Sequence, residues 1–350
     1  MSQNFDSARE GILSFVQYCV KSVFCEHVIN GKFTPRYNIK LTRKKTNMIL
    51  KNSLLICLVA VSTRAFDVPQ AQVLQKTTLE TILPRERYVA TNRFAVKKDK
   101  LAKFEQRWAT RKSRLAELEG FKYFHLMRRV SLEENDSKES ERDEFGNYVS
   151  FTVWNEKKNF DDWRKGDAFK EAHGGTSIGA FLSTMINSIM VMNGPPRPAF
   201  YDAILVQSKP PTFIPQLEDG WRKIESDGLN TLPKECFVAC NQFFVPEENM
   251  SAFEQRWAER ESKLAECDGF QSFFMLRRDG LGKGETQDPT YMSTTIWKDR
   301  AAFEGWRSGT VFKQGHSADK SNTKKTPLWS KPPEAVFYEG TLVITTPEGA

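Results

Sequence analysis

Apolar and polar residues alternate along residues 88–96, which predicts a β-strand. One face of this strand carries Tyr88, Ala90, Asn92, Phe94 and Val96. Residues 100–118 instead place their apolar side chains at helical spacing, and Gly120 ends the predicted helix. Residues 121–128 and 148–154 are predicted to form a hairpin, residues 160–173 a broken helix, and residues 200–206 a last strand.

This order of elements occurs twice, because the chain contains an internal repeat. The run FEQRWA at residues 104–109 recurs at residues 253–258, 149 positions later. Further along, the offset drops to 143, and a charged stretch at residues 131–147 accounts for the difference as a longer hairpin loop in the first copy. Six of the eight Trp residues pair across the copies: Trp108 with Trp257, Trp154 with Trp297, and Trp163 with Trp306.

Each copy has the order β-α-β-β-α-β, which is the ferredoxin-like pattern of an α+β fold. We therefore predict two ferredoxin-like domains in tandem, at residues 87–208 and 235–350. The proline-containing residues 209–234 form the predicted linker.

Residues 1–86 are predicted to be a leader. Residues 54–61 form an eight-residue apolar run, which is too short for a membrane-spanning helix of roughly 20 residues. The run is typical of a secretory signal that starts at Met48 and is cleaved after Ala65, and residues 1–47 are of doubtful status upstream of that start. An aromatic residue, Phe66, follows the cleavage point, as in the bipartite leaders of algae with secondary plastids. We expect a secretory-pathway leader, which leads either to such a plastid or to simple secretion.

The composition fits a folded protein with aromatic cores, since 39 % of residues are hydrophobic and 12 % are aromatic. Residues 1–50 hold eight basic and three acidic residues, so most of the net charge of +7 lies outside the repeats. Without a basic stripe on the repeats, no nucleic-acid partner is expected. Six Cys without a CxxC spacing and only four His argue against a disulfide scaffold and a zinc cluster.

Two asparagines occupy equivalent positions in the copies, Asn92 and Asn241. Each lies on the otherwise apolar face of a predicted strand, where an amide without a partner costs about 1–3 kcal/mol. A single such residue would suggest a sheet edge or a bulge. Because the placement occurs twice, we interpret both as amides that line a pocket.

Two histidines are also equivalent, His173 and His316. Each follows a Trp by ten residues, and a glycine lies between them in both copies (Gly166 and Gly309). A helix break at that glycine would bring the Trp and the His to one cavity. The alternative is a pair of surface histidines.

The runs FDDWRKGDAFKEAH (residues 160–173) and FEGWRSGTVFKQGH (residues 303–316), with the strand Asn upstream, resemble the antibiotic-biosynthesis-monooxygenase superfamily. Within it they resemble the bacterial iron-regulated heme-degrading monooxygenases. Members form dimers whose two sheets close one β-barrel. The resemblance therefore implies two dimeric α/β-barrel domains that form an intramolecular pseudo-dimer in a monomeric chain.

The resemblance also implies a site in each copy, built from Asn92, Trp163 and His173 and from Asn241, Trp306 and His316. The histidines would be proximal ligands of heme iron, the tryptophans would press on the porphyrin face, and the asparagines would donate a hydrogen bond to dioxygen on the distal side. Heme would be both cofactor and substrate, and the reaction would need O2 and an external electron donor, an unidentified reductant. It would open the porphyrin and release iron.

The segments after the two histidines differ, which predicts unequal sites. Residues 177–192 are mostly apolar and suit a heme-pocket wall or a core helix, whereas residues 317–326 are polar. We expect His173→Ala to remove more heme binding than His316→Ala. His125 is given no role. Two other functions stay open: a cofactor-free monooxygenase for an aromatic or quinone substrate, and a non-enzymatic ligand-binding barrel.

Overall fold

The computed structural model describes residues 83–133, 146–172, 188–260, 262–280, 288–310, 312 and 327–350. All of them belong to one compact unit, Leu79–Ala350. The predicted leader features at Met48 and Ala65 lie outside the described residues. In the part of the chain that is described, no helix is long and apolar enough to cross a membrane.

The first repeat has the predicted order of elements. It consists of β1 (Arg87–Phe94), α2 (Leu101–Ala109), β2 (Phe121–Val130), β3 (Tyr148–Trp154), α3 (Lys157–Lys165), α4 (Asp167–Ala172) and β4 (Arg197–Ser208). The second repeat consists of β5 (Cys236–Phe243), α6 (Met250–Ala258), β6 (Phe270–Arg278), β7 (Tyr291–Trp297), α7 (Arg300–Ser308) and β8 (Glu334–Thr345). Short 3-10 turns flank α2 and α6 at Lys98–Lys100, Leu115–Glu117, Glu247–Asn249 and Leu264–Glu266.

The helix predicted over residues 100–118 ends earlier than expected, at Ala109. Thr110 caps it: its backbone leaves the helical conformation (φ −93°, ψ 6°), and its hydroxyl donates to the carbonyl of Gln106 at 2.9 Å. The polar residues 111–114 supply no apolar side chain to hold a further turn against the sheet. The chain returns to the core only at Leu115, in a 3-10 turn.

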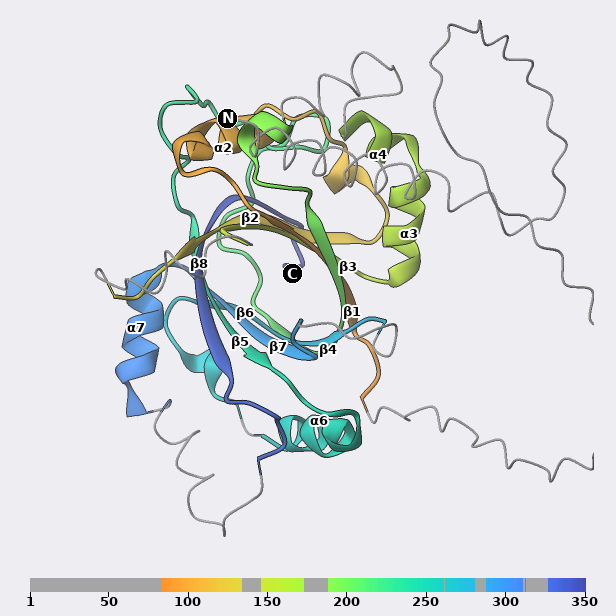
Figure 1. The fold of residues 1–350 in the computed structure, drawn as a ribbon, viewed down its shortest axis with the longest axis vertical. Coiled ribbons are helices and arrows are strands. Elements are labelled where there is room, and N and C mark those ends of the chain that lie inside the picture. The colour runs from red at the N-terminus through yellow and green to blue at the C-terminus, as the bar shows by residue number, and fades with distance from the viewer. Residues whose placement is uncertain are drawn as a thin grey trace, which may run out of the picture. The chain divides into compact units, whose positions relative to one another are not determined.

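Eight strands close an antiparallel barrel in the order β1-β3-β2-β8-β5-β7-β6-β4 (Figure 1). Each repeat contributes four neighbouring strands to it. The repeats meet at two seams, where β2 pairs with β8 and β4 pairs with β6. Both ferredoxin-like sheets are therefore completed by each other, and neither exposes an edge strand at the seams.

Alternation along the strands separates a barrel interior from an outer face. Val89, Phe151 and Val238 belong to a cluster inside the barrel. On the outer face of the first repeat, the predicted strand face is confirmed, since Tyr88, Ala90, Phe94 and Val96 share one cluster with helix residues. Figure 1 shows α2, α3 and α4 beside the first sheet and α6 and α7 beside the second.

The repeated run FEQRWA anchors each first helix to its sheet through a buried glutamate. Glu105 is fully buried and accepts hydrogen bonds from Arg128 (2.8 Å) and from the phenol of Tyr148 (2.6 Å). Glu254 accepts the equivalent bonds from Arg277 (3.0 Å) and Tyr291 (2.7 Å). In both copies, the Glu of the motif therefore binds an arginine of the hairpin on the face of the sheet that the helix covers.

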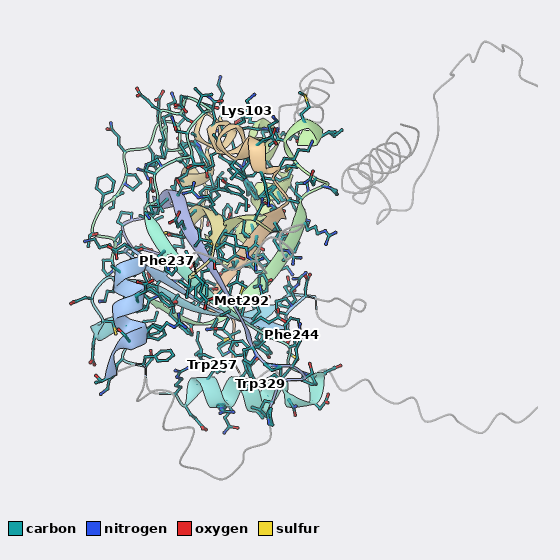
Figure 2. The ribbon with its side chains drawn as sticks, turned by 60° about the vertical axis from the view of Figure 1, so that its left-hand side comes forward. Lys103, Phe237, Phe244, Trp257, Met292 and Trp329 are labelled. Carbon is teal, nitrogen blue, oxygen red and sulfur yellow. The ribbon has the colours of Figure 1, made fainter. Side chains whose placement is uncertain are left out.

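Aromatic rings fill the space between each helix and its sheet. In the second repeat, Phe243 packs against Trp257 of α6 at 5.9 Å between ring centres and against Trp329 at 6.1 Å. Figure 2 labels these two tryptophans, which lie beside α6. In the first repeat, Phe94 packs against Trp108 at 5.9 Å, and Trp221 of the linker packs against that ring at 6.5 Å. Linker residues thus cover the first helix of the first repeat.

Candidate functional site

Asn92 lies near the end of β1, opposite Ser150 of β3 and Pro198 of β4. Strand alternation places it on the outer face, between the buried residues Ala90 and Phe94. Its side chain is half-buried and forms no hydrogen bond with any residue that the structure describes. An amide in such a place is available to a ligand.

Asn241 has the equivalent register position on β5, opposite Ser293 and Ala335. Its side chain is exposed, and it too has no hydrogen-bond partner among the described residues. The two asparagines thus occupy equivalent positions on equivalent strands of the two repeats, but their side chains differ in burial. This difference makes the two sites unequal, and it places the more sheltered amide in the first repeat.

The two site tryptophans repeat one geometry. Trp163 of α3 packs 5.6 Å from Trp154 and 5.7 Å from Phe160, with its ring inclined by 31° to Trp154. Trp306 of α7 packs 5.3 Å from Trp297, inclined by 34°. Each indole therefore lies over the outer face of its own sheet, held by an aromatic ring from the sheet.

Asn92 and Trp163 lie on the same outer face without touching each other. The connection runs through Phe160, which packs 5.7 Å from Trp163 and 5.4 Å from Phe200 of β4. Phe200 lies two residues from Pro198, the register partner of Asn92. The structure thus brings these two predicted residues to one face, separated by an aromatic layer.

The predicted helix break occurs at Gly166. It separates α3 from α4, and its N–H donates to the carbonyl of Trp163 at 3.0 Å. A Cβ at this position would lie 3.3 Å from the carbonyl oxygen of Asp162, a tight contact. His173 and His316 lie outside the described residues, so their predicted positions remain predictions.

Two arginines on and just after α2 of the first repeat have no role in the sequence analysis. Arg107 lies on α2, and Arg111 follows the helix, with its guanidinium 4.8 Å from the ring centre of Trp108. Neither forms an ion pair with a described residue; Arg107 donates only to the hydroxyl of Ser188, at 3.3 Å. The Nε of Arg111 is buried without a hydrogen bond among the described residues.

The electrostatics of this arginine pair favour an anion. Burial lowers the pKa of Arg111 to about 10, and the nearby charge of Arg107 lowers it further. Burial also lowers the pKa of Arg107. Two neighbouring cations without a carboxylate are destabilised by each other and by desolvation. A bound carboxylate would relieve both effects. The signal in the sequence was the spacing of four residues between the two arginines, which repeats as Arg256 and Arg260.

The apolar segment predicted after His173 is described only at its end. Val191 and Met192 pack against the outer-face cluster of the first repeat, whereas Ile189 and Met190 are exposed. The carbonyl of Val191 accepts a hydrogen bond from Lys97 at 3.0 Å. The segment therefore closes over the end of β1, and residues 177–187 lie outside the description.

Heme requires an apolar wall, cations for its propionates and a ligand for its iron. The first repeat supplies an apolar wall in the Trp163–Phe160 aromatic layer of its outer face, and it supplies two cations, Arg107 and Arg111, on and just after α2. Among the described residues, no group of three or more His, Cys, Asp or Glu could hold a bare metal ion. The described residues of the first repeat thus include groups suited to the apolar body and to the propionates of heme, whereas His173, the predicted iron ligand, lies outside the description.

The family model of the antibiotic biosynthesis monooxygenases matches residues 87–175 and 236–318. The two repeats thus belong to the antibiotic biosynthesis monooxygenase family, and the chain carries two copies of its domain in tandem. This family places the chain among monooxygenase-like proteins, a class of oxidoreductases.

Several solved structures are similar to this chain at low identity. A protein of Fusobacterium nucleatum proposed to be a monooxygenase is 13 % identical, with a TM-score of 0.47 and coverage of 76 % of this chain and 97 % of its own. An anthrone oxidase-like protein is 13 % identical (TM-score 0.42, coverage 74 % and 93 %). A heme degrader of Mycobacterium tuberculosis, solved with two hemes in its active site, is 20 % identical (TM-score 0.22, coverage 29 % and 93 %).

Proposed function

We propose that this protein is a heme-degrading monooxygenase whose substrate binds on the outer face of the first repeat and, more weakly, of the second. The observation that carries the proposal is Asn92, a half-buried amide on an aromatic face that forms no hydrogen bond with the described residues. Family membership and the run of residues 160–173 support the same reading.

The residues of the first repeat have separate tasks in this proposal. Arg107 and Arg111 bind the propionates, which fixes the orientation of the porphyrin. Trp163, supported by Trp154 and Phe160, presents a rigid aromatic surface to one porphyrin face. Asn92 donates a hydrogen bond to the bound substrate from the side of the sheet. Val191 and Met192 limit the access of water.

Heme, when bound, supplies an iron centre that activates O2, with electrons from an external donor. His173 and His316 are the proposed iron ligands. Because both repeats contribute to one barrel, we propose that a single chain acts as a monomeric pseudo-dimer. We further propose that residues 48–86 are a targeting leader to a plastid or the secretory pathway, which a fusion of these residues to a fluorescent protein tests by its location.

The test of heme binding is a titration of the chain with hemin, followed by the Soret band. We expect a shifted Soret band that is lost in the double variant His173→Ala plus His316→Ala. Of the single variants, His173→Ala should lose more binding, because its repeat has the more buried asparagine. The control is a substitution on the exposed surface that leaves both histidines in place, Lys158→Gln. Absence of any Soret shift would contradict the proposed function.

A further inference from the structure

Two tyrosines occupy equivalent places near one end of the barrel interior. Tyr201 of β4 and Tyr338 of β8 both belong to the cluster inside the barrel. Each lies opposite an arginine across a seam: Tyr201 pairs with Arg278 of β6, and Tyr338 pairs with Arg129 of β2. The two arginines are themselves equivalent, 149 positions apart in the repeat. Both seams therefore present the same tyrosine and the same arginine at the same end of the barrel.

Strand alternation points these arginines into the barrel. Each lies two residues after a side chain of the inner cluster, Met127 on β2 and Leu276 on β6. Arg93 of β1 points inward as well, because its neighbour Asn92 lies on the outer face. The wall of the barrel therefore separates this group of arginines from the proposed heme face of each repeat.

At the seam of β4 and β6, the inward-facing side chains already hold a carboxylate. Asp288 accepts two hydrogen bonds from Arg93, at 2.7 and 3.1 Å, and forms an ion pair with Arg278 at 3.0 Å. Arg278 also donates to the phenol oxygen of Tyr201 at 3.4 Å. Burial acts to raise the pKa of Asp288, but the two arginines hold it below its usual value. The molecule itself thus shows that this set of side chains binds a carboxylate.

At the seam of β2 and β8, the equivalent place receives no carboxylate from the described residues. In the sequence, the counterpart of Asp288 in the first copy is Phe145, and the second arginine is replaced by Gln242. Within the described part of the chain, Arg129 forms no ion pair. The amide of Gln242 and the phenol of Tyr338 likewise form no hydrogen bond there. One half of this end of the barrel is therefore filled by the protein, and the other half presents free donors.

The charges of the two halves do not balance. Arg93, Arg129 and Arg278 share the single carboxylate of Asp288, so three cations and one anion leave a charge of +2 among these residues. The Nε of Arg93 is buried without a hydrogen bond from any described residue. Partly buried cations that lack a carboxylate are stabilised by an anion that binds between them.

We propose that this end of the barrel interior is a binding site for a small dicarboxylate, separate from the proposed heme faces. One carboxylate of the ligand binds Arg129, Gln242 and Tyr338, in the place that Asp288 fills at the other seam. The second carboxylate accepts a hydrogen bond from the free Nε of Arg93. The two negative charges of the ligand match the excess charge of the site.

The probe for this site is succinate, titrated into the full chain by isothermal titration calorimetry. We expect one saturable site per chain, with affinity weakened about tenfold in Arg129→Gln, as for the loss of one charge-assisted hydrogen bond. Arg164→Gln is the matched control, because Arg164 is exposed and pairs with Asp161 at 3.4 Å. That variant should bind succinate as the unaltered chain does.

Two further measurements separate a binding site from a purely structural cluster. Gln242→Glu places a carboxylate beside Arg129 and should abolish succinate binding, with the fold checked by far-ultraviolet circular dichroism. The uncharged analogue succinamide should not bind. No saturable binding of succinate, binding retained in Gln242→Glu, or equal affinities in Arg129→Gln and Arg164→Gln would overturn the proposal.

The separation from the proposed heme faces has its own test. Saturation with hemin should leave the affinity for succinate unchanged, because the two ligands lie on opposite sides of the barrel wall. Competition between hemin and succinate would overturn the assignment of a separate site. The titrations with succinate alone contain no hemin, so their outcome is independent of the proposed heme degradation.

Discussion

The phenol of Tyr88 in the first repeat donates a 2.9 Å hydrogen bond to Asp279, which belongs to the second repeat. Tyr88 also packs 5.5 Å from Phe160, the α3 residue that supports Trp163. The side chain of Lys157, at the start of α3, contacts the same carboxylate and lies over the Tyr88 ring. The second repeat therefore fixes the helix that carries the candidate tryptophan of the first.

Replacement of this carboxylate tests the dependence of one repeat on the other. Asp279→Asn removes the charge that both Tyr88 and Lys157 contact, and we expect a loss of about 1–2 kcal/mol in unfolding free energy, because the pair is only partly buried. Urea unfolding followed by circular dichroism measures it. Asp162→Asn, whose pair with Lys158 is exposed, is the control and should change stability by less than about 0.5 kcal/mol. Equal effects of the two changes would refute the inter-repeat contact.

The buried glutamates predict a larger effect. Glu105→Gln removes the buried carboxylate from the guanidinium of Arg128, which keeps Glu339 as a partner at 3.0 Å, and we expect a cost of about 1.5–3 kcal/mol. Glu254→Gln should be similarly destabilising through Arg277. Exposed Glu117 provides the control substitution, Glu117→Gln. Denaturant midpoints measure all three, and a cost below about 1 kcal/mol for Glu105→Gln would show that the network is not stabilising.

His125 predicts a pH dependence of stability. It is fully buried inside the barrel, and burial lowers its pKa from the ordinary 6.5 to about 3. Between these pH values the unfolded chain binds a proton at this residue and the folded chain does not. The contribution of His125 to the free energy of unfolding is therefore lost as pH falls from 6.5 towards 3, by about 1.4 kcal/mol per pH unit at most.

The repeat itself supplies the control for this titration, since Phe274 is the counterpart of His125 in the second copy. His125→Phe should flatten the change in unfolding free energy between pH 6.5 and pH 5, where few carboxylates titrate. Urea unfolding at these two pH values measures the difference. Identical slopes in the two proteins would mean that His125 binds a proton as readily in the folded barrel as in the unfolded chain.

The arginine pair makes a prediction specific to the proposed substrate. Arg111→Gln removes a buried cation from the outer face of the first repeat and should weaken hemin binding about tenfold, as expected for one charge-assisted hydrogen bond. Arg114→Gln is the control, because Arg114 is exposed and already paired with Glu171 at 3.0 Å. Fluorescence quenching by hemin reports both affinities. Equal affinities in the two variants would exclude Arg111 from the site.

The repeat and the order of its elements followed from the sequence because periodicity reports local structure well. Strand alternation likewise predicted that Tyr88, Asn92 and Phe94 share one face of the sheet. Periodicity does not report which charges are buried, so the roles of Glu105 and Arg111 emerged only when their neighbours in the folded chain were known. The hydrogen bond between Tyr88 and Asp279 was also hidden, because it joins residues far apart in the sequence.

The central claim, heme degradation, is tested most directly by the fate of bound heme with ascorbate in the presence and absence of oxygen. The hemin complex of the full chain should lose its Soret band in air and keep it under nitrogen. The double variant Asn92→Ala plus Asn241→Ala should bleach more slowly in air while still binding hemin. A Soret band that persists in air with reductant would contradict the account and would identify the protein as a ligand-binding barrel.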